Sequence, residues 1–339
     1  MAVAGGTQRP AGDWLRSLRE LVPIPEPYRD ESMDRAAALE VLRCPEEVLD
    51  RVVAEGFPSI GEGEAQRFDR RDVYNLALHS GSGRSLPELG VAFLGRLGRE
   101  GEQAWSEPRT WRIGAQIRCP RRDGCGSDPA WAFGRPVPEE LGGELAESAL
   151  PAVADPDADV YEWSGEPGSA SLSATIATRG SVDRLVSGEA RDAFMAVVED
   201  YRFQVLPPAL RTDLDSVERI RAADCIAATG VLVRDCRAAG LEAEPQSGFL
   251  LGLFGFGGHR WVRVRDSDGR WKSLDPTLAM IAALGGHDSG DFLEYCRGSV
   301  LNRVVPCNTT PEGEVAGHSC DGESRLPDLA IRARRHDTE

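Results

Sequence analysis

The sequence predicts an α+β fold, in which a buried helix is followed by an antiparallel hairpin in the C-terminal half of the chain. Residues 225–239 are apolar on nearly every side, which is typical of a buried helix. Residues 259–264 alternate in polarity with a period of two, as expected for a strand with one buried face. The N-terminal segments instead show helical periodicity, so we expect a mainly helical N-terminal region.

Length and charge limit the classes of partner. The chain has 339 residues, which suggests two domains or one large domain, and 41% of them are apolar. Its formal net charge of −16 disfavours nucleic acids and anionic membrane surfaces. The chain lacks an apolar run of about 18 residues and a signal-peptide pattern, so we expect a cytoplasmic protein. In that compartment the eight cysteines would be free thiols.

Residues 1–140 are expected to form the mainly helical region. Ser85-Leu86-Pro87-Glu88 fits a capping box with proline in the first turn of a helix. The preceding glycine-rich loop could alternatively bind an anion, although it lacks the lysine of a nucleotide-binding loop. Residues 110–117 resemble a strand. Other helices are expected at residues 13–21, 32–42, 46–55 and 68–78.

The rest of the chain divides by composition. Residues 141–168 are acidic and rich in proline, glycine, alanine and serine, which predicts a linker or a long surface excursion. Residues 169–305 would then form the domain with the buried helix and the hairpin. Residues 306–339 would form a C-terminal tail.

Three residues with reactive side chains lie at the ends of these predicted elements. Cys225 begins the buried helix, His259 opens the first strand of the hairpin, and Asp275 follows the second strand. A helix N-terminus and a nearby imidazolium both lower the pKa of a thiol. We therefore interpret Cys225 as a nucleophile, His259 as its base and Asp275 as the acid that orients the histidine.

Four further residues are candidates for contacts with a substrate. The backbone N–H of Cys225 and the side chain of Gln246 could form an oxyanion hole, and Trp261 would pack beside the site. Residues 248–258 place Phe254 and Phe256 among glycines immediately before His259. This segment is either an apolar flap over an acyl group or a buried strand with a glycine-rich bend.

The motifs around these residues resemble the transglutaminase-like superfamily. They are Asp224-Cys225, His259-x-Trp261-x-x-Val264, an Asp-Gly turn, Trp271 and Leu274-Asp275-Pro276. The resemblance covers roughly residues 190–280. It implies a papain-like core, in which the cysteine helix packs on an antiparallel sheet, and it implies the Cys-His-Asp triad. Alanine replaces the usual glycine before Asp-Cys, and Glu244 replaces a frequent arginine, so the resemblance is to a divergent bacterial branch.

The resemblance implies a cysteine enzyme but leaves its reaction open. The leading expectation is acyl transfer through a cysteine thioester that forms or exchanges an amide bond, as in natural-product or peptide tailoring. The substrate would be a peptide, an amide or an acyl thioester, which a carrier could present. The alternatives are a peptidase or amidase with the same triad, and a non-catalytic interaction module.

The remaining cysteines offer the side chains of a metal site. Cys119 and Cys125, together with Cys307, His318 and Cys320, could bind zinc. Their spacings are irregular and no pair has the Cys-x-x-Cys spacing. We therefore expect neither a metal nor an organic cofactor.

Overall fold

The computed structural model describes residues 11–121, 124–149, 155, 157–252, 258–284 and 290–336. The chain forms two compact units. One contains Met1–Phe93 and Asp200–Ala227, and the other contains Leu94–Glu199 and Ala228–Glu339. The fold is α+β, as predicted, and every sheet of three or more strands is antiparallel across the described residues.

The first unit is mainly helical. Its helices are α1 (Ala11–Glu20), α2 (Arg35–Leu42), α3 (Glu46–Ala54), α4 (Arg70–Leu78), the start of α5 (Leu86–Leu97), α8 (Pro208–Thr212), α9 (Leu214–Ile220) and the start of α10 (Cys225–Ala238). Two-stranded pairs join β1 (Met33–Asp34) with β2 (Arg67–Phe68), and β8 (Arg202–Phe203) with β9 (Ala222–Ala223). The helices predicted in this part of the chain are confirmed.

Short-range hydrogen bonds explain where these helices begin. Asp69 caps α4, because its carboxylate accepts from the backbone N–H groups of Arg71 and Asp72. At the start of α5, Ser85 Oγ accepts from the Glu88 N–H at 3.3 Å, and Glu88 Oε2 accepts from the Ser85 N–H at 3.2 Å. The predicted capping box is therefore confirmed.

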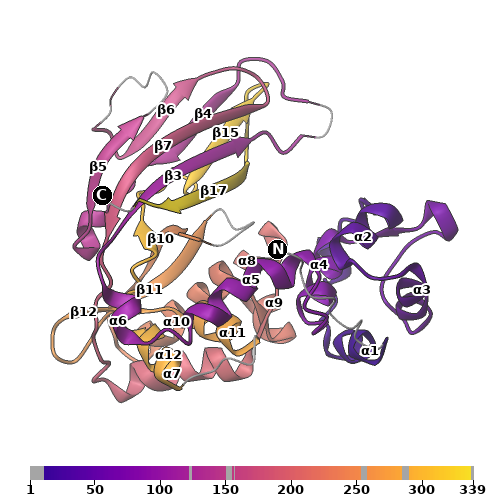
Figure 1. Cartoon of the computed structure of the whole chain (residues 1–339), viewed down its shortest axis with the longest axis horizontal. Helices are drawn as coiled ribbons and strands as arrows, with labels where there is room; N and C mark the ends of the chain where they lie inside the picture. The colour runs from indigo at the N-terminus through magenta and orange to yellow at the C-terminus, as the bar shows by residue number, and fades with distance from the viewer. Residues whose placement is uncertain are drawn as a thin grey trace. The chain divides into compact units, whose positions relative to one another are not determined.

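The second unit contains two four-stranded antiparallel sheets that share one core (Figure 1). Every second residue of β3 faces this core, from Trp111 to Ile117. The sheets have the strand orders β17-β3-β7-β5 and β16-β15-β4-β6. Their strands are β3 (Arg109–Arg118), β4 (Ala130–Gly134), β5 (Glu144–Ala149), β6 (Val160–Ser164), β7 (Ser169–Thr178), β15 (Ala316–Cys320), β16 (Glu323–Arg325) and β17 (Asp328–Arg335).

These two sheets form a sandwich, which corrects part of the domain organisation predicted from the sequence. The predicted helical region, 1–140, also contains β3 and β4. The segment 141–168, interpreted as a linker, contributes β5 and β6, and the expected tail, 306–339, contributes β15 to β17. Four of these strands, β5, β6, β16 and β17, are sheet edges, where charged residues are tolerated and the composition resembles that of a loop.

A five-stranded sheet forms the other half of the second unit, in the order β13-β12-β11-β10-β14. One of its faces joins the sandwich core through Phe249, Leu251 and Val305. On the opposite face, Trp261 lies against residues of α11 and α12. The strands are β10 (Ala243–Leu250), β11 (His259–Arg265), β12 (Trp271–Leu274), β13 (Arg297–Gly298) and β14 (Val304–Pro306). The helices of this unit are the rest of α5 and α10, α6 (Glu102–Ser106), α7 (Gly188–Asp200), α11 (Pro276–Leu284) and α12 (Gly290–Cys296).

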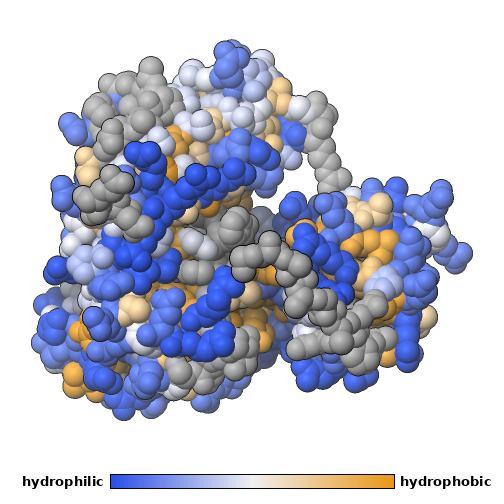
Figure 2. Space-filling model, viewed as in Figure 1, coloured by the Kyte–Doolittle hydropathy of each residue, from blue (hydrophilic) through white to orange (hydrophobic). Residues whose placement is uncertain are grey.

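The exposed surface is mostly hydrophilic on the face seen in Figure 2. Large exposed apolar side chains include Ile60 and Val186. Within the described part of the chain, no helix has both the length and the apolar character needed to cross a membrane.

Candidate functional site

His259 and Asp275 form a buried hydrogen-bonded pair. His259 Nε2 lies 2.6 Å from Asp275 Oδ2, and the two residues are 8% and 6% exposed. At such low exposure the contact is shielded from water, so it is stronger than a surface ion pair of the same length. The structure thus brings two of the three predicted triad residues, His259 and Asp275, into contact.

The register of the hairpin explains this contact. Val262 faces Leu274 across the β11–β12 pair. Extending that register by one residue sets Trp261 opposite Asp275, so His259 lies diagonally from Asp275 on the same face. Diagonal neighbours on an antiparallel pair are within reach of long side chains. The hairpin alone is therefore sufficient to bring the imidazole and the carboxylate together.

Both oxygens of the Asp275 carboxylate have partners. Oδ2 contacts His259, and Oδ1 accepts a hydrogen bond from the Leu278 N–H at 3.0 Å, at the start of α11. The Asp275 N–H donates to the Cys296 carbonyl at 2.9 Å. These bonds fix the carboxylate between the end of β12 and the first turn of α11, so it can hold the imidazole in one orientation.

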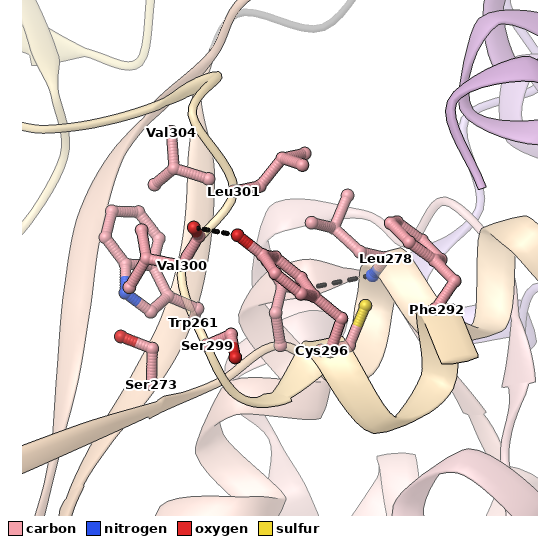
Figure 3. Close-up of a pocket in the computed structure, with 11 residues that line it drawn as sticks. Trp261, Ser273, Leu278, Phe292, Cys296, Ser299, Val300, Leu301 and Val304 are labelled. Carbon is pink, nitrogen blue, oxygen red and sulfur yellow. Dashed lines mark hydrogen bonds between the residues drawn. The ribbon is translucent and has the colours of Figure 1, made fainter. Parts of the chain in front are cut away.

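Trp261 supports the histidine from the side. Its ring is nearly parallel to the His259 ring, with centroids 5.7 Å apart and an interplanar angle of 21°. Trp261 also lines a cavity of about 10 Å³ beside Asp275, together with Leu278 and Phe292 (Figure 3). A cavity of this size holds at most one water molecule. It cannot admit a substrate, and its walls help to exclude solvent from the carboxylate.

Cys225 is the first residue of α10 and is partly buried. Asp224 caps this helix, because its Oδ1 accepts from the N–H groups of Ile226 and Ala227, each at 3.0 Å. Burial raises the pKa of the Asp224 carboxyl, although the charge of Arg211 and these N–H donors act in the opposite direction. The predicted position of the cysteine, in the first turn of a buried helix, is confirmed.

The other candidate residues have different surroundings. The amide of Gln246 is bonded at both ends, with Nε2 donating to Glu140 at 2.8 Å and Oε1 accepting from Arg263 at 3.2 Å. Phe249, at the start of the glycine-rich segment, is fully buried in the sandwich core. Phe254 and Phe256 lie outside the described residues. The oxyanion role of Gln246 and the flap therefore stay predictions.

One anchoring interaction was not identified from the sequence. The buried Lys272 ammonium contacts Asp266 at 2.6 Å and Asp268 at 2.7 Å within the β11–β12 turn. Asp266 also accepts hydrogen bonds from the N–H groups of Val186 and Ser187, at 2.7 and 2.8 Å. Lys272 is the only lysine of the chain, and its position two residues before Leu274, on the same face of the predicted strand, could have indicated that it points inward.

A family model covers the segment that contains these residues. Residues 173–276 match the family model of the transglutaminase-like superfamily. This range includes the cysteine, the histidine and the aspartate. No curated protein sequence matches the chain.

Two solved structures are similar to this chain. One is named "Putative Cysteine Protease" and comes from Cytophaga hutchinsonii; it has 12% identity and a TM-score of 0.44, over 69% of this chain and 93% of its own. The other is named a TGase and has 15% identity and a TM-score of 0.21, over 41% of this chain and 46% of its own. The family match is what assigns the domain: residues 173–276 of this chain form a transglutaminase-like domain, which is a cysteine-based catalytic fold.

Proposed function

We propose that this chain is a cysteine-dependent acyltransferase that forms or exchanges an amide bond through a thioester on Cys225. The supporting observation is the buried 2.6 Å contact between His259 Nε2 and Asp275 Oδ2 inside a transglutaminase-like domain. Because Nε2 is engaged by Asp275, the proposed general base is the other ring nitrogen, Nδ1. The proposed nucleophile is the Cys225 sulfur, in the first turn of α10.

In the first half of the proposed reaction, His259 Nδ1 accepts the proton of the Cys225 thiol and the sulfur attacks the carbonyl carbon of the donor. The backbone N–H of Cys225 is a candidate donor to the oxyanion that forms. The imidazolium then gives its proton to the leaving amine or thiol, and the acyl group stays on sulfur as a thioester. Asp275 stabilises the imidazolium without taking its proton.

In the second half, an acceptor amine attacks the thioester while His259 takes the proton of that amine. The product amide leaves and the proton returns to the Cys225 thiolate, so the enzyme is regenerated. Water in place of the amine would give a carboxylic acid, which is the peptidase or amidase alternative. The acyl donor class is a peptide, an amide or an acyl thioester. Phe254 and Phe256 are proposed to contact its acyl group.

The test uses p-nitrophenyl acetate as an activated acyl donor. We expect a burst of p-nitrophenol and an acetyl adduct on Cys225 that peptide mapping locates. Cys225→Ala should lose both signals, and His259→Ala should slow the burst by roughly 10²–10⁴-fold. Cys236→Ala is the matched control, because Cys236 lies on the same helix and its burial raises the pKa of its thiol to about 11. An adduct on another cysteine, with none on Cys225, would refute the proposal.

A second measurement separates transfer from hydrolysis. The acetyl enzyme is divided between buffer alone and buffer with glycine methyl ester, and the ratio of N-acetylglycine methyl ester to acetate is measured. Transfer predicts that the amide product rises with the amine concentration while the burst is unchanged. A product that remains acetate at every amine concentration would assign the site to hydrolysis. A chain that forms no acyl enzyme would be a non-catalytic module.

A further inference from the structure

Four side chains with metal-binding atoms meet at one end of the sandwich. They are Cys119, Cys125, His318 and Cys320, whose ligand atoms all lie within 4.8 Å of one another. Cys119 follows the end of β3, Cys125 lies in the connection to β4, and the other two belong to β15. His318 and Cys320 are buried, and the other two cysteines are partly buried.

The distance between one of these cysteines and the histidine agrees with tetrahedral zinc. Zinc–sulfur bonds of about 2.3 Å and zinc–nitrogen bonds of about 2.0–2.1 Å place neighbouring S and N ligands about 3.5 Å apart at a tetrahedral centre. Cys125 Sγ lies 3.5 Å from His318 Nε2. Three thiolates and one imidazole form a common ligand set of structural zinc sites.

The histidine is oriented as a metal ligand would be. Its Nδ1 lies 3.0 Å from the Ala130 carbonyl oxygen, so Nδ1 carries the proton and Nε2 is left with its lone pair directed toward the cysteines. The His318 ring also stacks on Trp131, with centroids 4.0 Å apart and an interplanar angle of 22°. These two contacts fix the ring before any metal binds.

The residues next to Cys125 are also held in place by polar contacts. Asp321 accepts from the N–H and the hydroxyl of Ser127, at 2.7 and 3.0 Å, and forms an ion pair with Arg121 at 2.5 Å. A Cβ atom at Gly126 would come within 2.0 Å of the Asp321 carboxylate and would displace that carboxylate from these contacts. The Gly126 N–H also donates to the Cys320 sulfur. Such N–H donors stabilise thiolate ligands.

We propose that Cys119, Cys125, His318 and Cys320 bind one structural zinc ion that ties the two sheets of the sandwich together. Four protein ligands complete the tetrahedron, so the ion would have no open position for catalysis. Cys125 and His318 are 193 residues apart in the sequence, and β3 and β15 belong to different sheets. The ion would therefore act as a cross-link, and it revises the expectation that the chain binds no metal.

A disulfide is the competing use of these thiols. It would join two of the three cysteines and leave the third thiol and the buried imidazole unsatisfied. The zinc site uses all four side chains, and Cys307, which the sequence had grouped with them, lies in the sandwich core instead. The geometry therefore favours the metal.

The test measures metal content on the full chain purified with zinc in the medium and a reductant. We expect about one zinc per chain by elemental analysis. Cys320→Ser should lose it, and Cys44→Ser, which changes a thiol in the other unit, should retain it. Because Cys225 is not a ligand, Cys225→Ala should also retain it, so failure of the proposed catalysis would leave this result unchanged.

Cobalt substitution covers the case in which Cys320→Ser fails to fold. Wild-type protein stripped of metal and loaded with Co²⁺ should show tetrahedral d–d bands and a thiolate-to-cobalt charge-transfer band, and zinc should displace both. Stripping should lower Tm and zinc should restore it. Metal-free wild-type protein without a cobalt spectrum, a disulfide among these cysteines in protein isolated without reductant, or iron in place of zinc would each overturn the proposal.

Discussion

Asp275 serves two neighbours at once, because one carboxylate oxygen caps α11 and the other contacts His259. Asparagine could still accept from the Leu278 N–H. Its NH₂ group would then face His259 Nε2 and donate to it, which favours the tautomer with the proton on Nδ1. That nitrogen is the one proposed to accept the thiol proton. Asp275→Asn therefore keeps the shape of the side chain but changes which ring nitrogen of His259 carries the proton, so the effect of the proton position can be measured.

Asp275→Asn is expected to lower the rate of the p-nitrophenyl acetate burst by roughly 10²–10⁴-fold while Tm changes little. The pH profile of the residual burst should also change, since the histidine no longer has a carboxylate beside it. Asp291→Asn, an exposed position in α12, is the control and should match wild type. An unchanged burst in Asp275→Asn would remove Asp275 from the proposed triad.

At the scale of the element, the β11–β12 hairpin owes its position to a buried charge cluster in its turn. Burial alone would raise the pKa of Asp266, but the Lys272 ammonium and the N–H groups of Val186 and Ser187 hold it at about 2. Because those two N–H groups lie in the segment before α7, they connect the turn to that helix. The turn end of the hairpin that carries His259 and leads to Asp275 is thus held in place.

Lys272→Met should destabilise the second unit by roughly 3–5 kcal/mol, because it leaves the Asp266 carboxylate buried without its cation. The control is Arg270→Met in the same turn, where the Arg270 side chain is 67% exposed and pairs with Asp183. Its loss should cost about 0–1 kcal/mol. Urea unfolding measures both. Equal effects from the two substitutions would show that the buried cluster does not anchor the hairpin.

At the scale of the whole molecule, the sequence predicted the contacts between residues that lie close together along the chain. His259 and Asp275 are 16 residues apart within one hairpin, so alternation and turn residues were enough to pair them. The sandwich was missed because β17 pairs with β3 from the opposite end of the chain, as shown by Asp328 facing Arg118. The cysteine cluster was set aside for the same reason. Its two halves come together only after the two sheets have packed.

Two buried aspartates, one in each unit, should contribute to stability with opposite dependence on pH. Burial raises the pKa of Asp72, in the first unit, to about 7, and its Oδ2 has no hydrogen-bond partner among the described residues. A raised folded-state pKa means that Asp72 holds a proton in the folded unit that it releases in the unfolded chain, so the contribution of Asp72 to stability falls as pH rises from about 4 to about 7. Asp266 has a depressed pKa, so its contribution is complete above about pH 4 and is lost as pH falls toward 2.

Asp72→Asn tests this expectation, because it removes the ionisation and keeps an acceptor for the Ile24 N–H, which donates to Oδ1 at 2.9 Å. The variant should resemble wild type in stability near pH 4 and gain on it by about 1.4 kcal/mol per pH unit up to about pH 7, with no further gain above. Urea unfolding at a series of pH values measures the difference. Asp50→Asn, an exposed carboxylate in α3, serves as the control and should show no such slope. A difference between Asp72→Asn and wild type that stays constant from pH 4 to pH 8 would show that Asp72 remains ionised in the folded unit, in which case its burial is compensated by charges such as Arg29.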